Sequence, residues 1–161
     1  LELGWSNVIT FGDWSINAFF RGAFGHSLIS TFRAFYEPNV PSQTSYNQMN
    51  TKLREPSLGV AQYSSLYVEK ADFFMLDNLT ISRRFDFGAD KAIKDAIVSF
   101  SARRPLIFTG YTGTDPTPEL YDAGNVGDDD PGADALLAPG IDRRADYFAS
   151  RSFGLGLKLN F

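Results

Sequence analysis

Apolar and polar residues alternate along the last ten residues of the chain, SFGLGLKLNF. The apolar side chains occupy every second position: Phe153, Leu155, Leu157, Leu159 and Phe161. Glycine, lysine and asparagine fill the positions between them. A two-residue period predicts a strand with one apolar face and one polar or small face. Such a strand suits both a soluble sheet and a membrane barrel, so the rest of the chain must distinguish them.

Four further stretches have strand-like patterns, and we predict strands over residues 3–11, 14–25, 73–87 and 96–111. The last of these is less regular, because Arg103-Arg104-Pro105 interrupts it. Proline cannot donate a hydrogen bond to a strand ladder, so we expect a β-bulge or an irregular stretch there.

The connections between these strands differ in length. Gly12-Asp13 forms a short turn signal, and residues 88–96 form another short link, whereas residues 26–71 and 112–150 are long. In an up-and-down meander, this order places the short turns at one end and the long loops at the other. Outer-membrane barrels have this asymmetry, whereas long structureless loops are uncommon in compact soluble domains.

The two long connections have different compositions. Leu28, Ile29, Phe32 and Phe35 have nearly helical spacing, which predicts a short helix ending at Glu37-Pro38. The second connection is rich in Pro, Gly and Asp. Its acidic residues could ligate calcium, but without the full EF-hand spacing we favour a solvated loop. These acidic residues are Asp122, Asp128, Asp129, Asp130 and Asp134. We find no repeat and no domain boundary.

Composition excludes several classes of function. The net charge of −4 argues against nucleic-acid binding, which requires clustered Lys and Arg. With no cysteine and only His26, the chain lacks a disulfide framework, a His/Cys zinc site and a recognisable catalytic set. We therefore predict no enzyme, no metal and no cofactor. No apolar run is long enough for a transmembrane helix. The start at Leu1, without methionine or a signal pattern, suggests a mature or cut fragment.

Most of the seven tyrosines fall in or beside the long connections. Tyrosines there could stack on sugars or peptides, or form the aromatic girdle of a barrel. For those that adjoin predicted strands we expect the girdle. For Tyr46 and Tyr121 both interpretations stay open.

Four ordered motifs resemble the C-terminal end of the SusC/RagA family of TonB-dependent outer-membrane transporters. They read FRGAFGHSLISTFRAFYE, YVEKADFFMLDNLTISRRF, YTGTDPTPEL and PGIDRRADYFASRSFGLGLKLNF, and together they span nearly the whole chain. The second motif is similar to a family pattern at Val68, Glu69, Asp72, Phe73, Leu76 and Asn78. The third matches the family pattern at Tyr111, Gly113, Asp115 and Pro116. The fourth matches at Gly140, Asp142, Arg151, Phe153 and Phe161.

The chain departs from the family pattern in a few places. Thr117 stands where the family usually has Glu, Phe148 where Pro commonly follows Tyr, and Arg104-Pro105 where Asn-Leu is usual. These departures concern local loop geometry.

The resemblance implies an all-β fold: about five antiparallel strands at the C-terminal end of a transmembrane barrel of about 22 strands. Its periplasmic turns are short and its extracellular loops long. The whole chain, 1–161, would be one barrel segment, with the plug and the other strands supplied by an upstream segment or another chain. The implied location is the bacterial outer membrane, with the C-terminus in the periplasm.

The resemblance also implies a function, the import of oligosaccharides or peptides. The implied partners are a SusD-like surface lipoprotein, TonB acting through the absent upstream region, and membrane lipid or lipopolysaccharide. The alternating strand that ends at Phe161 resembles the signal read by the barrel-assembly machinery. No substrate-binding residue is assigned.

Two other classes of protein are possible. A soluble β-sandwich that binds glycans would carry loops at both ends, which the one-sided loop distribution disfavours. An outer-membrane enzyme is disfavoured by the missing catalytic set. The barrel hypothesis also specifies which side chains face lipid: Trp14, Ile16, Ala18, Phe20, Leu79, Ile81, Phe85, Phe87, Val98, Phe100, Leu155, Leu157 and Leu159.

Overall fold

The computed structural model describes residues 1–39, 48–60, 62–118, 139–143 and 149–161. These residues form an all-β structure with mostly antiparallel strands and little helix. In chain order the elements are β1 (Glu2–Phe11), β2 (Trp14–Ala23), β3 (Ser27–Ser30), α1 (Thr31–Tyr36), the 3₁₀ helix η1 (Ser65–Tyr67), β4 (Val68–Lys70), β5 (Phe73–Asp86), β6 (Asp95–Thr109), β7 (Ile141–Asp142) and β8 (Ser152–Asn160). No helix among them is long and apolar enough to cross a membrane.

The chain divides into two compact units, which we describe separately. The sheet unit comprises Leu1–Phe24, Phe73–Thr109 and Ser150–Phe161. The loop unit comprises Gly25–Asp72 and Gly110–Ala149. The long connections therefore supply the loop unit, and the predicted strands supply the sheet unit.

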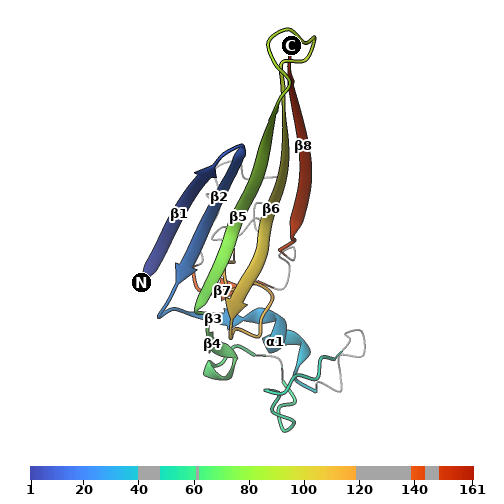
Figure 1. The fold of residues 1–161 in the computed structure, drawn as a ribbon. Coiled ribbons are helices and arrows are strands. Elements are labelled where there is room, and N and C mark those ends of the chain that lie inside the picture. The colour runs from blue at the N-terminus through green and yellow to red at the C-terminus, as the bar shows by residue number, and fades with distance from the viewer. Residues whose placement is uncertain (40–47, 61, 119–138, 144–148) are drawn as a thin grey trace, which may run out of the picture. The chain divides into compact units, whose positions relative to one another are not determined.

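The sheet unit is a five-stranded antiparallel meander in the order β1-β2-β5-β6-β8 (Figure 1). All five predicted strands are confirmed, with ends that differ by a few residues. Gly12, in the turn between β1 and β2, has a φ of +53°, a backbone conformation that glycine adopts without strain. β1 and β8 are the outer strands of the sheet in the part of the chain that the structure describes.

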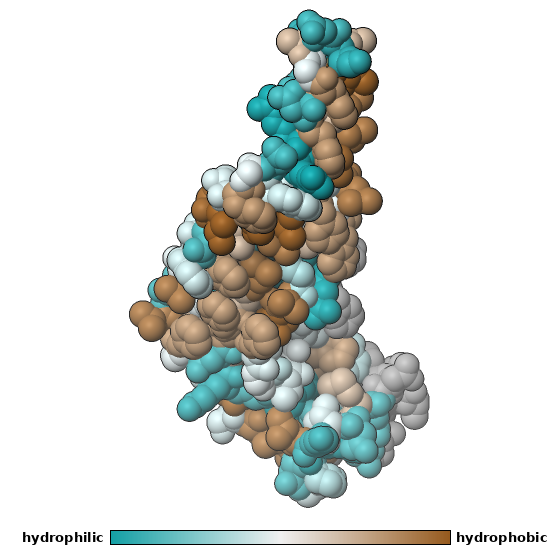
Figure 2. All heavy atoms as spheres, viewed as in Figure 1, coloured by the Kyte–Doolittle hydropathy of each residue, from teal (hydrophilic) through white to brown (hydrophobic). Residues whose placement is uncertain are grey.

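One face of this sheet is apolar. The register pairs Ile9 with Ile16, Ile16 with Ile81, and Ile81 with Phe100. Directly paired residues share a face, so these four side chains lie on the same side. The predicted lipid-facing residues all belong to this face except Phe87, which lies just beyond the end of β5. Apolar side chains gather over these strands in Figure 2.

The opposite face is polar and includes two glycines of β8. Its paired positions include Ser15, Asn17, Thr80, Ser82, Ser99 and Ser101. On β8, Gly154 and Gly156 pair with Ser101 and Ser99. A Cβ at Gly154 would lie only 2.9 Å from the Ser101 Oγ, so a glycine leaves this hydroxyl its space.

A β-bulge interrupts the pairing of β5 with β6, as the sequence predicts. Leu76 pairs with Leu106, but Asn78 pairs with Arg103, so Arg104-Pro105 opposes the single residue Asp77. Arg104 has a φ of +51°, which is unusual for a residue with a Cβ. The bulge places the proline where the ladder does not need its missing N–H.

The loop unit has a small sheet of its own. β3 pairs antiparallel with β4 and parallel with β7, although β7 lies more than a hundred residues further along the chain. The helix prediction was therefore only partly right. Leu28 and Ile29 belong to β3, and the helix begins later because Ser30 caps it: its hydroxyl accepts the N–H of Arg33.

The bulge generates a stability prediction. We expect the Arg104→Gly variant to be about 1 kcal/mol more stable than the Arg104→Val variant, because a β-branched residue is strained at positive φ. Both variants lack the guanidinium, so the comparison isolates the backbone. The measurement is the urea midpoint of unfolding. Arg103, the neighbouring position, is the control: the Arg103→Val variant should be at least as stable as the Arg103→Gly variant. If glycine were the more stable substitution at both positions, the assignment of a strained backbone to Arg104 would be contradicted.

Candidate functional site

Residues of the third and fourth sequence motifs meet around the carboxylate of Asp142. The Tyr111 hydroxyl donates to its Oδ2 at 2.7 Å, and the Thr114 N–H donates to the same atom at 2.9 Å. The Thr114 hydroxyl donates to Oδ1. Asp142 is only 1% exposed. Burial of a charge is costly unless it is hydrogen-bonded, so these donors are what allows a carboxylate in the interior of the loop unit.

Two motif glycines are required by this arrangement. A Cβ on Gly113 would overlap both the Tyr111 hydroxyl and the Asp142 carboxylate. Gly140 has a φ of +83°, and its carbonyl accepts the Ile29 N–H at 2.8 Å. The glycines therefore permit the close approach of the 111–114 segment and the pairing of β7 with β3.

The Asp115-Pro116 pair of the third motif closes a turn beside this cluster. The Asp115 Oδ1 accepts both the N–H and the hydroxyl of Thr117, each at 2.8 Å. Thr117, a departure from the family pattern, thus contributes a second hydrogen bond to the turn. The Pro116 carbonyl lies 3.4 Å from the His26 Nε2, which donates to it when that nitrogen carries the proton.

A second buried cluster is centred on Arg33 of α1. Its Nε and Nη2 donate to the two carboxylate oxygens of Glu37 at 2.6 and 3.1 Å, and its Nη1 contacts Glu69. Burial alone would lower the pKa of the Arg33 guanidinium, but the hydrogen bonds and charges of the two glutamates raise it. Arg33 therefore remains a cation between two carboxylates.

Glu69 joins this cluster to the 110–118 segment. Its carboxylate accepts the Thr112 hydroxyl at 2.7 and 2.9 Å and the Thr112 N–H at 3.3 Å. On the other side, the Thr51 hydroxyl donates to Glu37. Loss of one member of such a buried group leaves an uncompensated charge, which destabilises strongly. The two clusters therefore hold β3, α1, β4, β7 and the 110–118 segment together.

Sequence reasoning missed most of this second cluster. It identified Glu69 only through the family pattern, and it did not identify Arg33 or Glu37. Their four-residue spacing within a predicted helix was a usable signal, since such residues are neighbours on a helix surface. The partners Thr51 and Thr112 carry no such signal.

Two tyrosines have a role other than the expected one. We expected the tyrosines that adjoin strands to form a membrane girdle, but Tyr67 is 1% exposed and Tyr111 is 7% exposed within the loop unit. Burial, and then the hydrogen bond to Asp142, raises the pKa of the Tyr111 hydroxyl far above its usual range. Burial also raises the pKa of Tyr67. Tyr111 therefore stays protonated as a donor to Asp142.

The aromatic bands of the sheet unit consist of Phe and Trp instead. Near the end from which the long connections leave, Phe20 stacks on Trp5 and on Phe74, with centroid distances of 5.2 and 5.7 Å. At the short-turn end, Phe11 stacks on Trp14 at 6.5 Å. Both bands lie on the apolar face.

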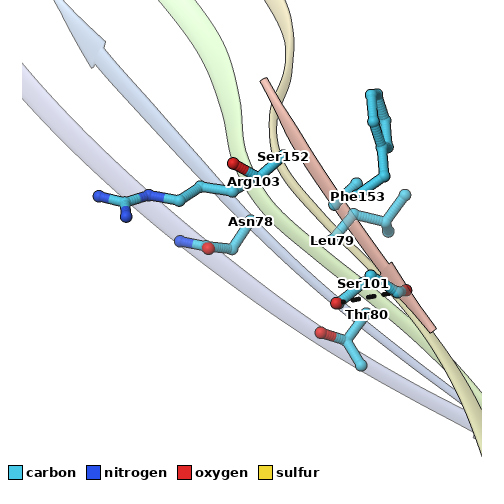
Figure 3. A pocket seen from close by; sticks show the side chains of 9 residues that line it. Asn78, Leu79, Thr80, Ser101, Arg103, Ser152 and Phe153 are labelled. Atoms are coloured by element: carbon cyan, nitrogen blue, oxygen red, sulfur yellow. Dashed lines mark hydrogen bonds between the residues drawn. The ribbon is translucent and has the colours of Figure 1, made fainter. Parts of the chain in front are cut away.

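A shallow groove of about 260 Å³ lies across β5, β6 and β8. Figure 3 shows the side chains of Asn78, Thr80 and Arg103 on one side of the sheet and those of Leu79 and Phe153 on the other. The polar side can hydrogen-bond polar groups, and it has no cluster of titratable groups suited to catalysis among its lining residues. The lining residues are Asn78, Leu79, Thr80, Ser101, Ala102, Arg103, Ser152, Phe153 and Gly154.

The remaining motif residues lie elsewhere. Arg151 is exposed and directly precedes β8 in the sheet unit, whereas Asp142 belongs to the loop unit. The apolar residues of the closing strand are exposed, with Leu155 at 85% and Phe161 at 75%. The acidic residues considered for calcium lie outside the described residues, as do Tyr46 and Tyr121. Among the described residues, no group of three or more His, Cys, Asp or Glu side chains could hold a metal ion.

Comparison with known proteins gives matches only among solved structures. No protein-family model and no curated protein matches the chain. The structure of the RagAB peptide transporter is 26% identical with a TM-score of 0.55, over 70% of this chain and 14% of that chain. The RagAB peptide importer is 22% identical in both its open-open and closed-closed states, with TM-scores of 0.67 and 0.70. Those two matches cover 99% of this chain and 17% of the importer chain.

These similarities define a shared fold. The chain spans between 14% and 17% of the length of the solved proteins that it matches. The solved proteins are named as transporters and not as enzymes. The fold that this chain shares with the importer structures extends over nearly all of the chain.

The Asp142 cluster generates a prediction for the loop unit. The Asp142→Asn variant places an NH₂ group among donors, and we expect it to destabilise the loop unit by about 1–3 kcal/mol. The measurement is amide hydrogen exchange of Ile29, whose N–H bonds to Gly140. Asp90→Asn, at an exposed position in the β5–β6 link, is the control. Unchanged exchange at Ile29 in the Asp142→Asn variant would show that the cluster does not hold β3 to β7.

Proposed function

We propose that this chain is the C-terminal barrel segment of a SusC/RagA-like, TonB-dependent importer of the bacterial outer membrane. The observation that carries the proposal is the apolar face of the five-stranded sheet, which is exposed along the edge strands. Ile9, Leu157 and Leu155, which all lie on the apolar face, are 54%, 66% and 85% exposed. An exposed apolar surface of this extent is typical of a surface that contacts lipid or another protein.

The length of β5 between its two flanking aromatic rings, Phe74 and Phe85, fits a membrane. The stretch of β5 from Phe74 to Phe85 spans about 36 Å along the strand, at about 3.3 Å per residue. At the tilt of about 35–45° usual for barrel strands, its height is about 25–30 Å. Barrels have an apolar band of about 25 Å flanked by aromatic girdles, so the stretch of β5 between these two rings has the length that a bilayer requires.

The outer strands support a larger barrel. Within the described residues, β1 and β8 have no strand neighbour on their outer sides, and each unpaired backbone group costs several kcal/mol in hydrocarbon. In the proposed protein, an upstream segment or another chain supplies the remaining strands, about 22 in all. The 1–161 segment would then carry neither the plug nor the segment that contacts TonB.

Partners and orientation follow from the same proposal. The short turns after β1 and β5 would face the periplasm together with the C-terminus, and the loop unit would belong to the extracellular side. There it would meet a SusD-like surface lipoprotein. The substrates would be oligosaccharides or peptides, and the peptide transport named for the RagAB structures favours peptides. Membrane lipid and lipopolysaccharide would contact the apolar face, and no catalytic residue is proposed.

A matched pair of lysine substitutions tests the orientation of the sheet. Ile81 and Ser82 are neighbours on β5 but occupy opposite faces. We expect Ile81→Lys to cost about 2–4 kcal/mol at mid-depth in lipid and Ser82→Lys to be tolerated. The measurement is the amount of heat-modifiable barrel in the outer-membrane fraction of cells that make the full-length protein. Equal abundance of the two variants would contradict the proposed lipid face, and extraction without detergent would favour a soluble glycan-binding module.

Removal of Phe161 tests the proposed assembly signal. The signal comprises the apolar residues of the closing strand, and Phe161 is its last ring. Deletion of Phe161 leaves the loop unit unchanged, so we expect lower barrel abundance with normal uptake per inserted molecule. Immunoblots of outer membranes and uptake assays normalised to abundance distinguish the two effects. Normal abundance with impaired uptake would contradict the role in assembly.

A further inference from the structure

A charged residue lies on the apolar face of the sheet. Arg83 of β5 pairs directly with Trp14 of β2 and with Val98 of β6, both of which belong to that face. The side chain is exposed. An arginine surrounded by apolar side chains on a proposed lipid face is costly at mid-depth and much less so near the membrane surface, so its environment needs an explanation.

Aromatic rings surround the Arg83 guanidinium. Its Cζ lies 5.3 Å from the centroid of the Trp14 ring and 4.8 Å from that of Phe85. These are cation–π distances, and ring contacts leave the N–H donors in the guanidinium plane available. The rings therefore orient the cation without using its hydrogen-bonding capacity.

The neighbouring cations of the sheet unit have acidic partners. Arg84, on the opposite face, pairs with Asp95 at 3.2 Å, and Arg21 pairs with Asp77 at 3.8 Å. Among the residues that the structure describes, no acidic side chain lies within ion-pair distance of Arg83. Its charge thus calls for an anion from outside this part of the chain.

The position of Arg83 along the strand indicates which anion. It lies two residues from Phe85 and directly opposite Trp14, within the aromatic band at the short-turn end. Arginine at such a depth extends its aliphatic stem along apolar surface and holds the guanidinium in the headgroup region. The anionic group at that level of a bilayer is the lipid phosphate, which a guanidinium binds through two parallel hydrogen bonds.

We propose that Arg83, oriented by Trp14 and Phe85, binds the phosphate of a glycerophospholipid in the periplasmic leaflet. This inference rests on the proposed function, which places the short turns at the periplasmic side of the outer membrane. Charge complementarity selects a phosphate-bearing lipid. The apolar side chains beside the site, Ile81 and Val98, provide the surface for its acyl chains.

Native mass spectrometry of the full-length barrel tests this site. The protein is purified in detergent with phosphatidylglycerol or with a diacylglycerol of the same acyl chains, which lacks the phosphate. We expect the unmodified protein to retain phosphatidylglycerol in preference to diacylglycerol, and Arg83→Gln to lower phosphatidylglycerol occupancy about tenfold. Arg83→Lys, which keeps the charge but not the planar donor pair, should give an intermediate loss.

The control is Lys158→Gln, which removes an exposed cation from the polar face of β8. It should leave lipid occupancy unchanged. Equal retention of both lipids by the unmodified protein, or equal occupancy in the Arg83→Gln and Lys158→Gln variants, would overturn the site. Displacement of the lipid by millimolar inorganic phosphate or preferential retention of lipopolysaccharide would overturn the assignment to a glycerophospholipid. In each of these cases the proposed import function stands if the barrel is inserted and heat-modifiable; absence of the unmodified protein from the membrane would instead refute that function.

Discussion

The structure depends on what covers the apolar face of the five-stranded sheet. Each strand contributes apolar side chains at alternate positions, and the antiparallel register aligns them into one continuous surface. In water this surface would favour aggregation. In a bilayer it would contact the acyl chains of the lipids at little cost, while the polar face would contact water or protein inside the barrel. The length of β5 between Phe74 and Phe85 and the outer strands β1 and β8 agree with the second environment, which we propose.

The loop unit solves a different physical problem. Segments far apart in sequence meet there, and the buried hydrophobic cluster among its described residues is small, consisting of Leu28, Ala71 and Tyr111. Buried charge and hydrogen bonds hold it instead: Asp142 is surrounded by neutral donors, and Arg33 lies between two carboxylates. Such groups specify one arrangement because each loses much more when unpaired than it gains when paired. Structural contacts thus account for the residues of the third motif that surround Asp142.

Much of the sheet could be predicted from the sequence because a period of two is a local signal. The strands, their order and the bulge at Arg104-Pro105 all follow from such signals. The loop unit could not be predicted in the same way. The spacing of Leu28 and Ile29 predicts a helix, because local spacing does not reveal that β3 pairs with β7, more than a hundred residues away in the sequence. The girdle prediction fails for Tyr111, at the end of the predicted strand 96–111, because a position beside a strand does not reveal burial. The two-residue period also does not distinguish an apolar face that contacts lipid from one that packs against a soluble core.

Site-directed fluorescence quenching tests the central claim most directly. This segment has no cysteine, so single cysteines at positions 79, 80, 81 and 82 of β5 can carry a fluorophore in the full-length protein, made free of other cysteines and reconstituted into vesicles. Nitroxide-labelled lipids should quench the labels at positions 79 and 81 strongly and those at 80 and 82 weakly, because in the proposed barrel alternate residues of the strand face lipid and the barrel interior. Equal quenching at all four positions, or the opposite alternation, would contradict the account.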